Sequence, residues 1–158
     1  MKYLLGGTAL LLLVFSSAAM ADNVFNCQDV GLTTPEPIGD QDGHALVVDN
    51  FSCRVEAGAM AGGVMTGTVA WDLNKGKGTL ISGTGVIRKP GSLVIYKDGE
   101  GTLNLTMNDK GQVTGGGANG TATWVFATGD ATPLKGKVLN WTSKGTGPGM
   151  FVVEEKTD

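Results

Sequence analysis

The sequence predicts an all-β fold, an antiparallel up-and-down barrel of about eight strands. Short segments in which apolar and polar residues alternate follow one another along the chain, separated by turn-forming residues. The 26 glycines are interleaved with apolar and β-branched residues, as expected where glycine punctuates strands. No stretch beyond residue 21 combines a 3.6-residue apolar period with capping residues. A barrel is favoured over a β-sandwich, the alternative, because closure leaves no exposed strand edge.

The clearest predicted strand is the segment 103–107, in which leucine and methionine alternate with asparagine and threonine. Such alternation is typical of a strand with one buried face and one solvent-facing face. Turn signals lie on both sides of it, at Asp98-Gly99 and at 108–111. The other predicted strands are, in chain order, 45–55, 64–71, 79–87, 92–97, 121–127, 135–142 and 150–154.

Glycine and proline mark the segments that are predicted to be irregular. Residues 22–43 are expected to form a loop, because prolines and glycines break regular structure there. Gly83 and Gly85 are expected at a bulge or bend within a strand. The glycine cluster at 115–117 and the segment 145–149 are expected to be connections between strands.

The first 21 residues have the pattern of a secretory signal peptide. Lys2 supplies a positive charge, an apolar run follows, and Ala19 and Ala21 form a small-x-small cleavage site. The apolar run is too short to span a bilayer, so no membrane anchor is expected after cleavage. The predicted organisation is a signal peptide, 1–21, followed by a single barrel domain, 22–158, in a periplasmic or secreted protein.

The charge balance of the mature chain is mildly acidic. Removing Lys2 leaves 11 Lys and Arg against 15 Asp and Glu, with no long cluster of basic residues. Nucleic acids and anionic membranes are bound through basic patches. The sequence therefore predicts neither a nucleic-acid partner nor attachment to an anionic membrane.

Two cysteines remain after cleavage, Cys27 and Cys53. In an exported chain, two cysteines allow one intramolecular pairing, and their spacing is not that of a redox or metal-binding pair. We expect a structural disulfide that fixes the N-terminal segment to the first predicted strand.

Motifs for nucleotide cofactors and for serine nucleophiles are missing. Gly115, Gly117 and Gly120 match G-x-G-x-x-G, but a strand follows them where the dinucleotide fingerprint requires a helix. The sequence holds no phosphate-binding P-loop and no nucleophile elbow. No cofactor is expected.

His44 is the only histidine, which excludes a histidine-rich metal site. It stands where the first loop meets the first strong strand, with Asp40 and Asp42 close in sequence. One hypothesis makes His44 a ligand contact or general base at the mouth of the barrel; the alternative is that it fixes the loop. The start of a calcium loop at 40–43 lacks the remaining oxygen ligands, so no metal site is expected.

Carboxylates suited to acid–base catalysis are present but are not paired by the sequence. Glu56, Asp72 and Glu100 all fall at or near the ends of predicted strands, where charge is common. Nothing brings two of them together, so no catalytic set is predicted.

Three tryptophans fall on three different predicted strands. Trp71, Trp124 and Trp141 each have apolar residues on the same strand face. If they converge inside a barrel, they are candidate ligand-binding residues that stack on a sugar or line an apolar cavity. The alternative is that they fill a solid core.

Segments 43–46 and 51–53, followed by 120–124 and 134–137, resemble a family of small exported bacterial domains of unknown function. That family in turn resembles the allene oxide cyclase and dirigent barrels of the calycin type. The resemblance implies an eight-stranded barrel with an interior cavity. It carries no activity across, because no cyclase catalytic residue has a match here and the dirigent Gly-Gly-Thr-Gly signature is absent, with 128–131 in the corresponding region.

Together these observations favour a non-catalytic, exported binding barrel that holds a small apolar or amphipathic ligand or docks an envelope protein. Two alternatives from other classes stay open. The first is a cyclase- or isomerase-like enzyme with His44 or a buried carboxylate as base, which requires a titratable group inside the barrel. The second is an envelope-stress or inhibitor protein that acts through its loops.

Overall fold

The computed structural model describes residues 22–31, 33–109 and 113–157. The predicted signal peptide, 1–21, lies outside the described residues. In chain order the elements are β1 (Asn23–Asp29), β2 (Glu36–Pro37), β3 (His44–Ala57), β4 (Val64–Asn74), β5 (Lys77–Lys89), β6 (Ser92–Met107), β7 (Val113–Ala127), the 3₁₀ helix η1 (Gly129–Leu134), β8 (Val138–Gly147) and β9 (Met150–Thr157).

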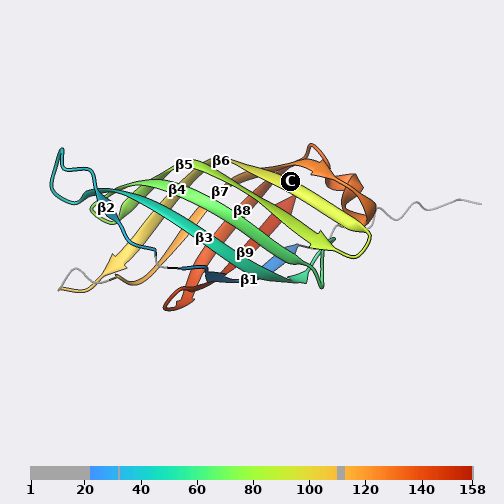
Figure 1. The fold of residues 1–158 in the computed structure, drawn as a ribbon, viewed down its shortest axis with the longest axis horizontal. Coiled ribbons are helices and arrows are strands. Elements are labelled where there is room, and N and C mark those ends of the chain that lie inside the picture. The colour runs from blue at the N-terminus through green and yellow to red at the C-terminus, as the bar shows by residue number, and fades with distance from the viewer. Residues whose placement is uncertain (1–21, 32, 110–112, 158) are drawn as a thin grey trace, which may run out of the picture.

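The strands form a closed antiparallel barrel, seen from the side in Figure 1. From β3 to β9, each strand pairs with the next along the chain, as in an up-and-down meander. β1 then pairs with both β3 and β9 and closes the ring at eight strands. The short β2 pairs only with the beginning of β3 and is not part of the ring. The predicted barrel is therefore confirmed, and the sandwich alternative is wrong.

The prediction that residues 22–43 form a loop is wrong at both β1 and β2. In β1, Asn23, Phe25 and Cys27 are buried and alternate with residues that face outward. This segment is short and only weakly apolar, so its own propensity does not favour a strand. Hydrogen bonds from β3 on one side and β9 on the other impose the extended conformation.

Two predicted turns are also wrong, because the strands run through them. Asp98-Gly99 lies within β6, where the pairing with β7 shifts register between Asp98 and Gly101. The shift indicates a β-bulge that bends the strand without ending it. Likewise the glycines at 115–117 belong to β7 and pair with β6. Pairing of β6 with β7 on both sides of the bulge, and of residues 115–117 with β6, keeps both segments within strands.

One end of the barrel is filled with apolar side chains. Met60 from the β3–β4 connection and Leu134 from η1 are buried there, together with Trp124 and Phe25 on the barrel wall. Figure 1 shows η1 lying across this end of the molecule. The sequence analysis did not predict η1, a single short helix that contains Pro133. We call this the closed end.

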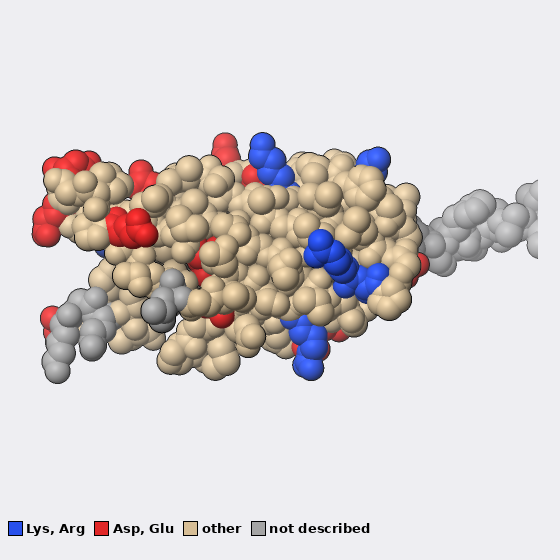
Figure 2. All heavy atoms as spheres, in the orientation of Figure 1, with Lys and Arg blue, Asp and Glu red and all other residues tan. Residues whose placement is uncertain are grey.

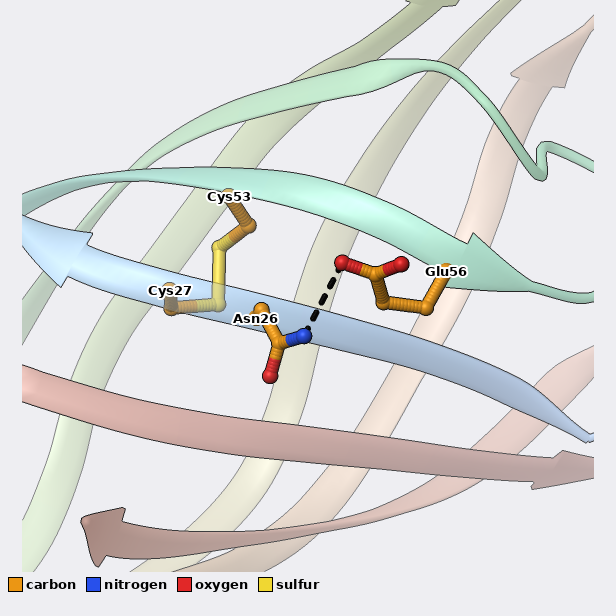
Figure 3. The surroundings of a disulfide bond; sticks show 4 residues. All are labelled: Asn26, Cys27, Cys53 and Glu56. Carbon is orange, nitrogen blue, oxygen red and sulfur yellow. Dashed lines mark hydrogen bonds between the residues drawn. A yellow bond between two sulfur atoms is a disulfide. The ribbon is translucent and has the colours of Figure 1, made fainter.

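The predicted disulfide between Cys27 and Cys53 is confirmed. The two residues face each other in register on β1 and β3, and both side chains are buried. Beside them, on the outer face, the Asn26 side chain donates a hydrogen bond of 2.9 Å to Glu56 (Figure 3). The covalent link therefore joins the strand that closes the barrel to the first strand of the meander.

Replacing Cys27 and Cys53 together by alanine should lower the free energy of unfolding by about 3.5 kcal/mol, because the unfolded chain loses a loop constraint. Urea unfolding followed by tryptophan fluorescence measures the change. The reduced wild-type protein is the matched control and should unfold near the same urea concentration as the variant. An unchanged midpoint would contradict a stabilising role for the disulfide.

Candidate functional site

A cavity of about 670 Å³ occupies the other half of the barrel. It opens at the end where the β1–β2 and β8–β9 connections and the start of β7 lie, opposite η1, and we call this the open end. Its apolar and aromatic lining residues are Val47, Phe51, Met65, Val69, Trp71, Tyr96, Leu103, Leu105, Val113, Ala118, Trp141, Met150, Phe151 and Val153.

The hollow exists because the inward positions of β7 and β8 at the open end carry small residues. Gly116, Ala118 and Gly145 all line the cavity. At the closed end the inward positions of the same strands are occupied by Trp124 and Leu139, which are fully buried. Large side chains of β7 and β8 thus fill the closed end, whereas small residues of the same strands leave space beside the aromatic lining of the open end.

The three tryptophans all point inward, as predicted, but they do not form one cluster. Trp71 and Trp141 line the cavity and contact each other edge to face, with ring centroids 6.5 Å apart. Trp124 belongs to the packed core of the closed end and is absent from the cavity lining. A second edge-to-face pair, Phe51 and Phe151, lines the cavity with centroids 5.6 Å apart.

Tyr96 and Asp98 bring polar groups into the cavity from β6. Room for both depends on inward-facing glycines of neighbouring strands. A Cβ at Gly85 or Gly67 would collide with the Tyr96 hydroxyl, and a Cβ at Gly83 would collide with the Asp98 carboxylate. Tyr96 is 4% exposed, and its hydroxyl has no hydrogen-bond partner within the described part of the chain.

Glu155 brings a second deep carboxylate into the cavity from β9. Its side chain is 4% exposed, and its Oε2 accepts a hydrogen bond of 3.2 Å from the side-chain amide of Asn23. The carbonyl oxygen of the same amide accepts a hydrogen bond from the backbone N–H of Ala59. Asn23 therefore links this carboxylate to the β3–β4 connection and fixes its orientation.

Burial raises the pKa of both deep carboxyls. The pKa of Glu155 rises to about 7, chiefly through loss of solvent, while the hydrogen bond from Asn23 lowers it and the charge of Asp98 raises it further. Burial alone raises the pKa of Asp98 to about 6. For Tyr96, burial and then the two carboxylates raise the phenol pKa, so the hydroxyl keeps its proton.

A further pair of carboxyls lies nearer the opening. Asp49 and Asp29 both line the cavity, and Thr33 donates a hydrogen bond of 2.8 Å to Asp49. Burial raises the pKa of Asp49 to about 6; the bond from Thr33 opposes the shift, and the charge of Asp29 adds to it.

His44 lies outside the cavity lining. Its Nδ1 is 2.6 Å from Asp40 and its Nε2 is 2.7 Å from Asp72, so it connects the loop before β3 to the outer face of β4. The hydrogen bonds to Asp40 and then Asp72 raise the pKa of His44, with burial opposing them. This geometry matches the structural alternative, in which His44 fixes the loop.

Neither Asp98 nor Glu155 was predicted from the sequence as a candidate site residue, and the three carboxylates that were considered lie elsewhere. Glu56, Asp72 and Glu100 lie on the outer surface of the barrel and do not line the cavity. Asp98 is two residues after Tyr96 and therefore lies on the same face of the strand. The turn predicted at Asp98-Gly99 ended the strand too early for this to be recognised. For Glu155, the same period runs through Phe151 and Val153, all on the inner face.

Among residues 22–31, 33–109 and 113–157, no group of three or more His, Cys, Asp or Glu side chains is placed to hold a metal ion. Over the same residues, no helix is long and apolar enough to cross a membrane. No family model, no curated protein and no solved structure matches the chain.

Glu155→Gln should change how stability depends on pH. A folded-state pKa raised from 4.5 to about 7 means that Glu155 does not destabilise the folded protein below pH 4.5, and that its destabilising contribution grows as the pH rises to about 7. Relative to wild type, the variant should therefore gain about 2–3 kcal/mol in the free energy of unfolding between pH 4 and pH 8. Urea titrations at the two pH values measure this gain.

The matched control is Glu154→Gln, which removes an exposed carboxylate on the opposite face of the same strand. Its stability should follow the wild-type pH profile. If Glu155→Gln also followed that profile, the Glu155 carboxyl would not be desolvated in the folded protein.

Proposed function

We propose that this chain is a binding protein whose barrel holds a small apolar or amphipathic ligand in the interior cavity. The observation that carries the proposal is a cavity of about 670 Å³ that is open at one end and lined mainly by apolar and aromatic side chains. Ligand sites in proteins commonly have volumes of about 300–1,000 Å³, with apolar walls and a few placed polar groups.

The two aromatic pairs support this function. Trp71 with Trp141, and Phe51 with Phe151, present flat apolar surface to the cavity. Aromatic rings give large contact areas to a ligand at little cost in conformational entropy. The polar groups Tyr96, Asp98 and Glu155 line the same cavity and would fix the orientation of a ligand.

We propose an exported location for the protein, periplasmic or secreted. The disulfide between Cys27 and Cys53 is compatible with an oxidising compartment. The resemblance to allene oxide cyclase and dirigent barrels stays a prediction, as does docking of an envelope protein. Neither is needed for the binding function proposed here.

Filling the cavity with a larger side chain should weaken ligand binding. Titration with a panel of lipids and apolar metabolites should change the tryptophan fluorescence, because Trp71 and Trp141 line the cavity. For a ligand found in this way, Val153→Trp should weaken binding about tenfold or more, because the larger side chain occupies ligand space, a loss of at least about 1.4 kcal/mol.

The matched control is Val152→Trp, a change of the same size on the neighbouring residue, whose side chain points to the outer face of β9. It should leave the affinity within about twofold of wild type. Circular dichroism and thermal unfolding establish that both variants are folded. A panel that never alters the fluorescence, or equal loss in both variants, would count against an interior site.

A second candidate function, proton transfer in a cyclase- or isomerase-like enzyme, is favoured by the titratable groups in the cavity. Glu155, with a pKa of about 7, is suited to exchange a proton near neutral pH. The Tyr96 hydroxyl keeps its proton and has no hydrogen-bond partner among the described residues, so it would donate to a ligand oxygen that reaches it. In such a reaction the Glu155 carboxylate would take a proton from a carbon next to a carbonyl and return it elsewhere on the same ligand.

Incubation of a bound carbonyl ligand in D₂O separates the two functions. An enzyme would incorporate deuterium at carbon, detected by mass spectrometry, and Glu155→Gln would stop the incorporation while the ligand still binds. A binding protein would leave the ligand unlabelled. Glu154→Gln is again the control that should behave as wild type.

A further inference from the structure

The charges that line the cavity all have one sign. The carboxyl groups that line the cavity are those of Asp29, Asp49, Asp98 and Glu155, contributed by β1, β3, β6 and β9. No Lys, Arg or His is among the described residues of the lining. The negative groups in the cavity therefore have no cationic side chain beside them.

The deep carboxylates are held toward the cavity by the architecture around them. Glycine at position 83 leaves the space that the Asp98 carboxylate occupies. Asn23 binds one oxygen of Glu155 and ties it to the β3–β4 connection. Burying a carboxylate costs free energy unless the group is paired with a cation or hydrogen-bonded. The hydrogen bond from Asn23 offsets only part of this cost for Glu155.

A second, independent observation is the Tyr96 hydroxyl. It is nine-tenths buried, lines the cavity and has no partner in the described structure. Leaving a buried hydroxyl unpaired is unfavourable. The hydroxyl packs against Gly67 and Gly85, and a ligand N–H that reaches this wall of the cavity would supply the missing hydrogen bond.

The aromatic side chains of the cavity, like its carboxylates, are suited to contact a cation. Cations are attracted to the faces of tryptophan and tyrosine rings, and the attraction grows when water is excluded. Trp71, Trp141 and Tyr96 all border the same cavity as the carboxylates. Rings combined with carboxylates are the groups that recognise organic ammonium ions.

Charged side chains on the outer surface are also distributed unevenly between the two ends of the barrel. Figure 2 shows acidic side chains gathered at the end of the molecule that carries β2, with basic side chains nearer the opposite end. The cavity opens at the same end as β2. A negative potential around an opening raises the local concentration of cations and speeds their association.

We propose that the cavity selects an organic cation, a small molecule in which a protonated amine is joined to an apolar body. The inference rests on the binding function proposed above. The ammonium group lies between Asp98, Glu155 and the Tyr96 hydroxyl, and the apolar body lies against the two aromatic pairs. The raised pKa values of Asp98 and Glu155 agree with this assignment, because a bound cation would lower both and release protons near neutral pH.

Three probes with a phenyl ring on a four-carbon chain test the charge preference: 4-phenylbutylamine, 4-phenylbutanol and 4-phenylbutyrate. Isothermal titration at pH 8, where the carboxyls facing the cavity are ionised, should give an affinity for the amine about tenfold higher than for the alcohol. The butyrate should bind most weakly. Lowering the pH to 5 protonates Asp98, Glu155 and Asp49 while Tyr96 stays neutral, so it should weaken binding of the amine and leave the alcohol nearly unchanged.

Substitutions of the two carboxylates test whether the preference for the amine arises inside the cavity. Asp98→Asn and Glu155→Gln should each weaken binding of the amine about tenfold and change the alcohol less than about twofold. Glu100→Gln and Glu154→Gln, which remove exposed carboxylates from the same two strands, should affect neither probe. Thermal unfolding verifies that every variant is folded. Tyr96→Phe removes the hydroxyl while both carboxylates stay in place, so it tests the contribution of the hydroxyl to binding of the amine.

The outcomes separate this inference from the proposed function. An alcohol or butyrate that binds as tightly as the amine overturns the cation preference while the binding function stands. The same holds if no phenylbutyl probe binds but a neutral or anionic member of the wider panel does. If nothing in either set binds, both the inference and the proposed function fail.

Discussion

The fold depends on the pairing of β1 with β3 and β9. Without this seven-residue strand, the meander from β3 to β9 would be an open sheet with two exposed edges. Phe25 and Cys27 would leave the core of the closed end, and Asn23 would no longer orient Glu155. A strand with few apolar residues is therefore held by the disulfide, by hydrogen bonds on both sides and by its buried side chains. The shape of the cavity therefore depends on the pairing of β1 with β3 and β9.

The same eight strands form a packed core at one end of the barrel and a cavity at the other. Large residues such as Trp124 and Leu139 make the closed end a conventional packed core. At the open end, glycines on β7 and β8 leave space, and glycines on β4 and β5 make room for Tyr96 and Asp98. Carboxyls with raised pKa values reduce stability at neutral pH. Their presence in the interior is more readily explained by binding than by folding.

The sequence contained most of the fold but only part of the site. Regular alternation in β4, β5 and β6 predicted strands, and the two cysteines predicted the disulfide, because these signals are local. β1 could not be predicted from its own residues, since its conformation comes from two strands distant in sequence. Trp71 and Trp141 were found by their inward positions. Asp98 and Glu155 were missed because a charged residue on an inner face becomes evident only once the register of the strand is known.

The seam of the barrel also joins strands that are made at very different times. β1 emerges early in synthesis, whereas its partner β9 is the last strand, so the ring is completed only after the whole barrel sequence is present. Until then the edges of β1 and β9 are open to pairing with other chains, as in other folds dominated by distant contacts. The contact between β1 and β3 is much more local, and the disulfide secures it. Early oxidation of Cys27 and Cys53 would hold β1 in place as a template on which the arriving β9 docks.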